Sequence, residues 1–293
     1  GGTVYAPKGT YLLNQTDAAL KTCLKIYSNT ALVGDGRGIT IFKRADGVTA
    51  YNFRNADTTG NSHIFLKGMS WNSNAACVAR RGSYTFANRT ATFTNVKLYS
   101  KTVPNFIPAA GDLVNSFAGQ GSSVFATTYA VQSATYDPNT SNGTLTVVLQ
   151  ASGGTSHGTA YDAAPGSDFS GTPGLKFRIF RSPASSNATT GWIGMGGVMM
   201  NVTDFWMENV GFYNEVQFAC WINGFQNIGG YDLDFLTAKD GIDLTGTQDL
   251  VGGSFGAQFD MIRGVCEDNF FAINTDGGTF FTPSNGPFTT GGV

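Results

Sequence analysis

A short pattern recurs along the chain: an apolar residue, a variable residue, then Gly, Asn or Asp, followed by an apolar, a variable and usually another large apolar residue. Its clear copies are Leu66–Trp71, Phe93–Leu98, Met207–Phe212 and Tyr231–Phe235, and a weaker copy is Ile262–Glu267. Gly, Asn and Asp most readily adopt the left-handed backbone conformation, and the alternation around them is typical of strands. The pattern therefore predicts two strands joined by a one-residue left-handed corner, repeated several times.

The spacing of the copies favours one all-β architecture over another. The distance between copies is about 27 residues from Met69 to Val96, 23 from Val210 to Leu233 and 32 from Leu233 to Val265. Such a loose period predicts a β-solenoid, in which each coil covers the apolar face of its neighbour. An ordinary β-sandwich is the alternative, because it also has many short strands and turns. A sandwich gives no reason, however, for a left-handed position to recur between matching apolar positions.

The beginning of the chain carries a second signal. The segment GGTVYAPKGTYLL, followed by SNTALVGDGRGITIF, resembles the opening coils of the pectate-lyase-like right-handed parallel β-helix superfamily, which includes phage tailspikes. The residues that carry this resemblance are Gly2, Tyr5, Pro7, Gly9, Tyr11, Leu32, Gly34, Gly36, Thr40 and Ile41. The resemblance implies an all-β chain folded as a right-handed parallel β-helix, and it also implies a homotrimer. It says little about activity.

Composition and charge exclude several classes of function. Only 13% of the residues are charged and the net charge is -2, so the chain lacks the field that would hold nucleic acid or an anionic membrane. The cysteines show no CxxC pairing, which argues against a zinc ribbon or a redox motif and favours free thiols. The glycine-rich GDGRG precedes a strand-like segment instead of a helix, so it does not predict a phosphate-binding loop. No apolar run approaches the roughly 20 residues of a membrane span.

Residues 104–190 interrupt the coil pattern. Within them, Asn142 and Gly143 stand between two alternating segments, which is a β-hairpin signal. We therefore expect β-helix coils over 1–103, an inserted small β subdomain over 104–190, and further coils over 191–293. The last residues give no polar cap for the open apolar end of a solenoid, so we expect the natural chain to continue beyond them.

Acidic residues follow the corners of the last three copies. Glu215, Asp240 and Asp268 each precede an apolar strand-like run, so the coil pattern predicts that their carboxyl groups stack at one edge. Neighbouring strands lie about 4.8 Å apart, which gives separations near the roughly 5–9.5 Å between the two carboxylates of a glycoside hydrolase. Stacked like charges also raise at least one pKa, as a general acid requires. Asp243 and Asp276 are further candidates, and capping of turns in water is the alternative role for all five.

Other residues around this edge fit a sugar polymer. Aromatic rings offer flat faces to sugars, although a place in the core is their alternative role; the candidates are Trp206, Tyr213, Trp221 and Tyr231. Arg263 could hold a uronate carboxylate, as a polysaccharide lyase requires, so these residues do not separate a lyase from a glycoside hydrolase. Calcium would suit an acidic edge, but no fixed-loop spacing indicates a site for it. The only histidines, His63 and His157, have no Cys or His partners nearby in the sequence, which argues against a histidine metal site. We therefore expect no resident metal or cofactor.

The residues and the resemblance together lead to one principal hypothesis. We expect a fragment of a virion tailspike or tail fibre that serves host recognition, whose β-helix binds and depolymerises a bacterial surface polysaccharide as a glycoside hydrolase or polysaccharide lyase. Its partners would be that polysaccharide, other copies of itself in a homotrimer, and other virion tail proteins. Its location would be the virion tail or the extracellular space. A non-catalytic structural or adhesive virion fibre and a secreted polysaccharide lyase or glycosidase are the alternatives.

Overall fold

The structure is a computed structural model of the 293-residue chain. It describes residues 1–48, 50–80, 83–87, 90–98, 108–116, 128–137, 142–148, 176–180, 196–215, 218–237, 241–245, 257–266 and 273–276. These residues lie in strands, turns and irregular segments, and none of them belongs to a helix. The described part of the chain is therefore all-β, as the repeat predicts.

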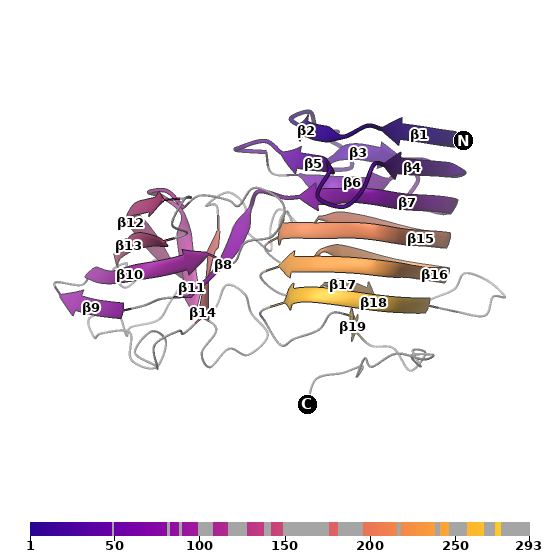
Figure 1. The fold of residues 1–293 in the computed structure, drawn as a ribbon. Helices are drawn as coiled ribbons and strands as arrows, with labels where there is room; N and C mark the ends of the chain where they lie inside the picture. The colour runs from indigo at the N-terminus through magenta and orange to yellow at the C-terminus, as the bar shows by residue number, and fades with distance from the viewer. Residues whose placement is uncertain are drawn as a thin grey trace.

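The strands form two sheets of different kinds (Figure 1). The larger sheet is parallel and twelve-stranded; its strands are β1 (Gly2–Ala6), β2 (Gly9–Leu13), β3 (Thr22–Ile26), β4 (Thr30–Gly34), β5 (Thr40–Arg44), β6 (Tyr51–Asn55), β7 (Asn61–Asn72), β15 (Gly197–Glu215), β16 (Cys220–Thr237), β17 (Ile242–Thr245), β18 (Ala257–Cys266) and β19 (Ile273–Asp276). The smaller sheet is antiparallel and seven-stranded; its strands are β8 (Ala76–Arg80), β9 (Ser83–Ala87), β10 (Thr90–Leu98), β11 (Leu113–Ser116), β12 (Thr128–Asp137), β13 (Asn142–Val148) and β14 (Lys176–Phe180).

The long strand β15 shows how the parallel sheet is built. Its start pairs with β6, its middle runs beside the first half of β7, and its end runs beside the second half of β7. The next strand, β16, follows β15 in one register from Gly197 to Tyr213, and the register shifts between Tyr213 and Glu215. Figure 1 shows the resulting stack, in which β1, β4, β7, β15, β16 and β18 follow one another away from the N-terminus. The parallel sheet therefore consists of stacked strands that bend at shared positions.

The bends fall at residues with a left-handed backbone. Gly68, Asn209 and Asp232 have φ angles of 68°, 53° and 55°. The strand register places these three residues at the same level of β7, β15 and β16. Asn209 Nδ2 donates a hydrogen bond to Asp232 Oδ2 at 2.6 Å, which ties two neighbouring bends together. The predicted left-handed corner is confirmed at all three positions.

The copy Phe93–Leu98 lies in the antiparallel sheet. Asn95 has the predicted left-handed backbone, with a φ angle of 52°, but it stands at a bulge where β10 changes register against β13. Grouping this copy with the coils was wrong, because a left-handed residue forms bulges as well as corners. The change of sheet falls between Asn72 and Ala76, so it precedes the boundary expected after residue 103.

The weaker copy of the repeat is displaced along β18. Met261 has a φ angle of 51° and takes the level of Asp232. Leu233 accordingly pairs with Ile262 and not with Val265 as the pattern predicts. The prediction was wrong here because the pattern admits only Gly, Asn and Asp at the corner, whereas the folded strand places Met there.

A column of aromatic rings lies in the core of the parallel sheet. Phe42 stacks on Trp71 with ring centroids 4.7 Å apart, and Trp71 meets Phe53 at 4.6 Å. Phe212 and Phe235 are paired in the strand register and continue the column, with centroids 5.9 Å apart. All five side chains are buried. Because each ring packs against rings of neighbouring strands, the column favours the observed register over a shifted one.

Candidate functional site

The outer face of the parallel sheet between two bends is a candidate binding surface. In β15, Phe205 and Met207 are fully buried in the core, whereas Trp206 and Glu208 are partly exposed. Strand side chains alternate between faces, so Trp206 and Glu208 lie on the outer one. The neighbouring strands are in register here, and their outward residues form two rows that we call the outer sheet face. The rows are Ala31, Phe65, Trp206, Gly229 and Gln258, and beside them Val33, Lys67, Glu208, Tyr231 and Asp260.

Aromatic side chains give the outer sheet face its apolar area. Trp206 lies over Gly229, where an added Cβ atom would come within 2.2 Å of Trp206 Cζ3, so the glycine leaves the room that the indole ring occupies. Tyr231 is 46% exposed and stands in the second row. Phe65 is partly exposed in the first row, next to Trp206. Such rings can contact the apolar faces of sugar rings.

Charged and amide groups lie beside these rings. Lys67 Nζ is 2.6 Å from Glu208 Oε1, and the two side chains are 44% and 36% exposed. At this exposure an ion pair contributes less than about 1 kcal/mol, so both groups can turn towards a ligand with little loss. Gln258 Nε2 donates a hydrogen bond to Asp260 Oδ2 at 3.0 Å at the far end of the rows. The outer sheet face thus combines rings with hydrogen-bond donors and acceptors.

Polar side chains at the bends border the outer sheet face on two sides. On one side, Arg37 Nη1 donates hydrogen bonds to the carbonyl oxygen of Asp232 at 2.8 Å and to its Oδ1 at 3.1 Å. On the other side, His63 Nε2 lies 3.2 Å from Asp204 Oδ2, and Asn227 Nδ2 donates to Asp204 Oδ1. The contacts of Asp204 connect the neighbouring strands β7, β15 and β16, and the contact of Arg37 connects the turn between β4 and β5 to β16.

The first predicted acid, Glu215, lies inside the protein. Its side chain is fully buried, and the strand register places Thr237 of β16 and Cys266 of β18 at its level. Asp240 and Asp268 lie outside the described residues. Glu215 is therefore not exposed to a polymer at the protein surface, and a stack formed with the other two acids stays a prediction.

The predicted aromatic residues divide between the surface and the core. Trp206 and Tyr231 lie on the outer sheet face. Tyr213 is fully buried, and its hydroxyl group donates a hydrogen bond to Asp234 Oδ2 at 2.9 Å, so it belongs to the core. Trp221 is partly buried and packs against a small apolar cluster beside β15. The structure thus brings two of the four candidates together on one face.

Three further predicted residues are placed only in part. Arg263 pairs through its backbone with Asp234, and Asp276 pairs in the same way with Thr245, but their side chains lie outside the described part of the protein. Asp243 is 1% exposed, so its carboxyl group does not reach the surface.

Glu215 belongs to a buried polar cluster with Arg44, Ser73 and Asn52. Ser73 Oγ donates a hydrogen bond to Glu215 Oε1 at 3.3 Å, and Asn52 Nδ2 donates to Ser73 Oγ at 3.1 Å. Arg44 Nε donates to the carbonyl oxygen of Ser73 at 2.8 Å. Burial raises the pKa of Glu215 well above its usual range, against the opposing attraction of Arg44. Burial also lowers the pKa of Arg44 to about 10.

Replacing Glu215 with Gln is expected to flatten the pH dependence of stability. Because burial raises the pKa of the folded carboxyl group, its stabilising contribution is complete below the unfolded pKa of about 4.3 and is lost as pH rises through the folded pKa. The slope from this one group is at most about 1.4 kcal/mol per pH unit. Thermal unfolding midpoints from acid to alkaline pH measure it. The partly exposed control Glu208→Gln should keep the wild-type slope; an equally steep slope in Glu215→Gln contradicts the assignment.

Comparison with models of known protein families gives no match, and comparison with curated proteins gives none either.

Cys23 and Cys220 are free thiols, as expected. Within the described ranges, no helix is long and apolar enough to cross a membrane. No group of three or more His, Cys, Asp and Glu side chains gathers there in a way that could hold a metal ion.

Several residues of the outer sheet face are absent from the sequence-based candidates. The repeat contains a signal that identifies them, because the variable position directly before each left-handed corner is the outward position of its strand. In the repeat that position is occupied by Lys67, Glu208 and Tyr231, whereas Asp260 takes it only because the structure places the corner of β18 at Met261. Of the residues directly before a corner, only Tyr231 is among the sequence-based candidates. The acidic candidates were taken from positions after the corners instead.

Proposed function

We propose that the protein binds a bacterial surface polysaccharide along the outer sheet face. The observation that carries this proposal is the alignment of Trp206 and Tyr231 with Lys67, Glu208 and Asp260 on one exposed face of stacked parallel strands. Stacked strands repeat similar positions along the stacking direction, so they present an extended surface to a polymer of repeating units. That surface presents both rings for sugar faces and polar groups for sugar hydroxyls.

The proposed fold is a right-handed parallel β-helix of which the twelve-stranded sheet forms the wall. Left-handed bends at the same level of successive strands and the aromatic column between them support it. The resemblance of the first residues to the pectate-lyase-like superfamily supports a virion tailspike or tail fibre, and with it a homotrimer in the virion tail. Sedimentation of the full-length protein as a stable monomer would count against that version.

Hydrolysis of the bound polymer is a second candidate function, which the spacing of Glu208 and Asp260 favours. Both residues are in register with Tyr231, one on each side, so their Cα atoms lie about 9.6 Å apart, twice the strand spacing. Inverting glycoside hydrolases hold their two carboxyl groups about 6.5–9.5 Å apart, with a water molecule between one of them and the sugar. In that role one carboxyl group protonates the glycosidic oxygen and the other removes a proton from water.

Trp206→Ala and Tyr231→Ala are each expected to weaken polysaccharide binding about tenfold or more, because aromatic anchors carry much of the energy of an interface. Titration of the protein with a panel of purified bacterial capsular and O-antigen polysaccharides measures the effect. Tyr27→Ala is the matched control, since Tyr27 is 58% exposed and is not part of either row of the outer sheet face. The proposal fails if no polysaccharide binds, or if all three variants bind like the wild type.

The same incubation reports turnover through chain length, reducing ends and the ultraviolet absorbance of unsaturated uronates. Shortening without absorbance, lost in Glu208→Gln and Asp260→Asn, assigns hydrolysis to this pair. Shortening with absorbance assigns a lyase. Binding without shortening assigns a non-catalytic adhesive fibre.

A further inference from the structure

The antiparallel sheet carries a face of hydroxyl groups. Thr92 of β10 pairs with Thr85 of β9 and with Thr146 of β13, and Thr146 pairs in turn with Ser133 of β12. Side chains of directly paired residues in antiparallel strands project from the same face of the sheet. These four hydroxyl groups therefore form a row across four strands, and all four side chains are exposed or partly exposed.

The opposite face of this sheet is its core. Phe93, which follows Thr92 in β10, is fully buried, and Val131 and Ile179 are buried with 3% and 0% exposure. Since neighbouring residues of a strand point to opposite faces, the hydroxyl groups lie on the face that does not pack into this core. The hydroxyl face is thus available to a ligand over the described residues.

A bulge opens a hollow on the hydroxyl face. Asn95 has a φ angle of 52°, and the pairing of β10 with β13 shifts register between Phe93 and Val96. Thr144 lies opposite the bulge and pairs with Thr135. The hollow has a volume of about 390 Å³, within the roughly 300–1,000 Å³ of small-molecule pockets. The side chains that line it are those of Thr94, Asn95, Thr135, Tyr136, Asp137 and Thr144.

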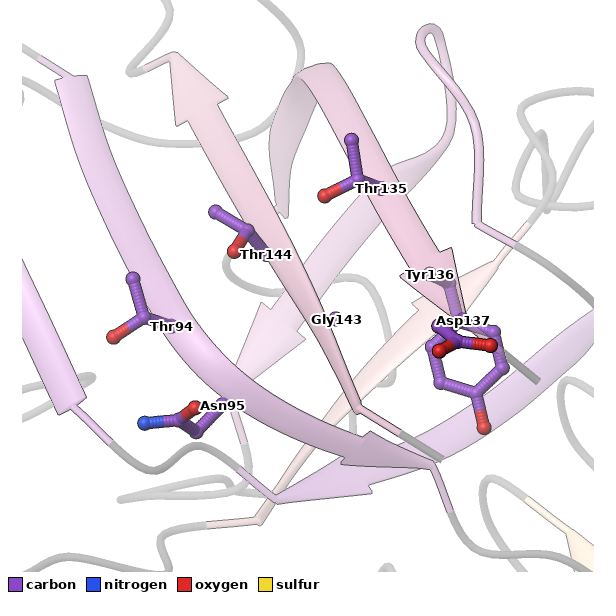
Figure 2. A pocket seen from close by; sticks show the side chains of 7 residues that line it. All are labelled: Thr94, Asn95, Thr135, Tyr136, Asp137, Gly143 and Thr144. Atoms are coloured by element: carbon purple, nitrogen blue, oxygen red, sulfur yellow. The ribbon is translucent and has the colours of Figure 1, made fainter. Parts of the chain in front are cut away.

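Figure 2 shows how these side chains are distributed. Thr94 and Asn95 lie on one side of the hollow, Thr144 lies in the middle, and Tyr136 and Asp137 lie on the other side. Each Thr hydroxyl group can donate one hydrogen bond and accept two, and the Asn95 amide group both donates and accepts. The ring of Tyr136 adds a flat apolar surface at the edge. This combination suits a ligand that carries many hydroxyl groups on a ring.

The charge of the lining restricts the ligand further. Asp137 is the one charged residue among the side chains that line the hollow, and none of these side chains is basic. A carboxylate accepts hydrogen bonds from sugar hydroxyl groups but repels uronates and phosphates. We propose that the hollow binds an uncharged oligosaccharide as a glycan site separate from the outer sheet face. The inference does not rest on the proposed function, because the two sites share no residue.

Titration of the full chain with neutral gluco-, manno- and galacto-oligosaccharides, followed by saturation-transfer NMR, tests this site. We expect at least one of them to bind, and we expect Thr144→Val and Asn95→Gly to weaken it about tenfold, the effect of one lost hydrogen bond with its partner left unpaired. Valine keeps the shape and strand preference of threonine, and glycine keeps the left-handed backbone of Asn95. Thr85→Val is the matched control, since it makes the same change on the hydroxyl face away from the hollow.

Three results would overturn the inference. In the first, none of the neutral oligosaccharides binds. In the second, Thr144→Val and Asn95→Gly bind like Thr85→Val. In the third, oligogalacturonates bind as tightly as the neutral sugars. Trp206→Ala and Tyr231→Ala separate the two sites, because both should leave this affinity unchanged; if they abolish it, the sugar occupies the outer sheet face and the second site is refuted while the proposed function stands.

Discussion

Arg44→Ala is expected to lower the free energy of unfolding by about 3–5 kcal/mol, because two hydrogen bonds from a buried charged group are lost at about 1.5–3 kcal/mol each. Arg44 is 1% exposed, and its guanidinium group donates hydrogen bonds to the carbonyl oxygens of Ser73 and Ala50. Alanine leaves these buried acceptors unpaired and removes the cation that attracts Glu215. Equilibrium denaturant unfolding followed by circular dichroism measures the loss.

Lys43→Ala is the control for this variant. Lys43 precedes Arg44 in β5 and is partly exposed, so its replacement should change the free energy of unfolding by no more than about 0.5 kcal/mol. The double variant Arg44→Ala with Glu215→Gln should recover part of the loss, because it no longer leaves a buried acid without its cation. A loss below about 1 kcal/mol for Arg44→Ala, or equal losses for Arg44→Ala and Lys43→Ala, would show that the buried cluster does not stabilise the fold.

Trp71→Ala is expected to destabilise the protein by about 3–5 kcal/mol, the range for large aromatic residues truncated in a core. Trp71 is fully buried in the aromatic column, with the rings of Phe42 and Phe53 on either side. Truncation to alanine leaves a cavity at Trp71, so the rings of Phe42 and Phe53 both lose their contact with the indole ring. The midpoint and slope of the denaturant transition measure the loss.

Trp71→Phe separates packing from hydrogen bonding at this position. Trp71 Nε1 is buried and has no hydrogen-bond partner among the described residues, so phenylalanine removes an unpaired donor while it keeps a ring in the column. We therefore expect less than half of the loss caused by alanine. Equal losses for phenylalanine and alanine would mean that the column does not depend on ring stacking.

The bends were predictable because their cause is local. Gly68, Asn209 and Asp232 are residue types that tolerate a left-handed backbone, and each stands between apolar residues that alternate as in a strand. The few residues around each position are therefore enough to predict the bend. The all-β class followed from the same pattern. Asn95 has the same local preference but forms a bulge, because its pairing with β13 depends on a strand that the local pattern does not contain.

The candidate site was less predictable, because it depends on contacts between distant segments. The burial of Glu215 depends on Arg44 and Ser73, which come from strands far earlier in the chain, so an acid next to a corner can be either exposed or buried. Trp206 and Tyr231 were found as aromatic residues near the corners. Their common face follows from the register of β15 and β16, which also brings Glu208 beside Tyr231.

The direct pairing of β7 with β15 has a consequence for how such proteins diversify. The whole antiparallel sheet lies between these two strands in the sequence, yet they are neighbours in the stack. Recombination near the two junctions, after Asn72 and before Gly197, could exchange the segment between them while the register of the remaining strands is preserved. Such an exchange would replace the antiparallel sheet as one unit. The strands of the parallel sheet would keep their sequence and their pairing.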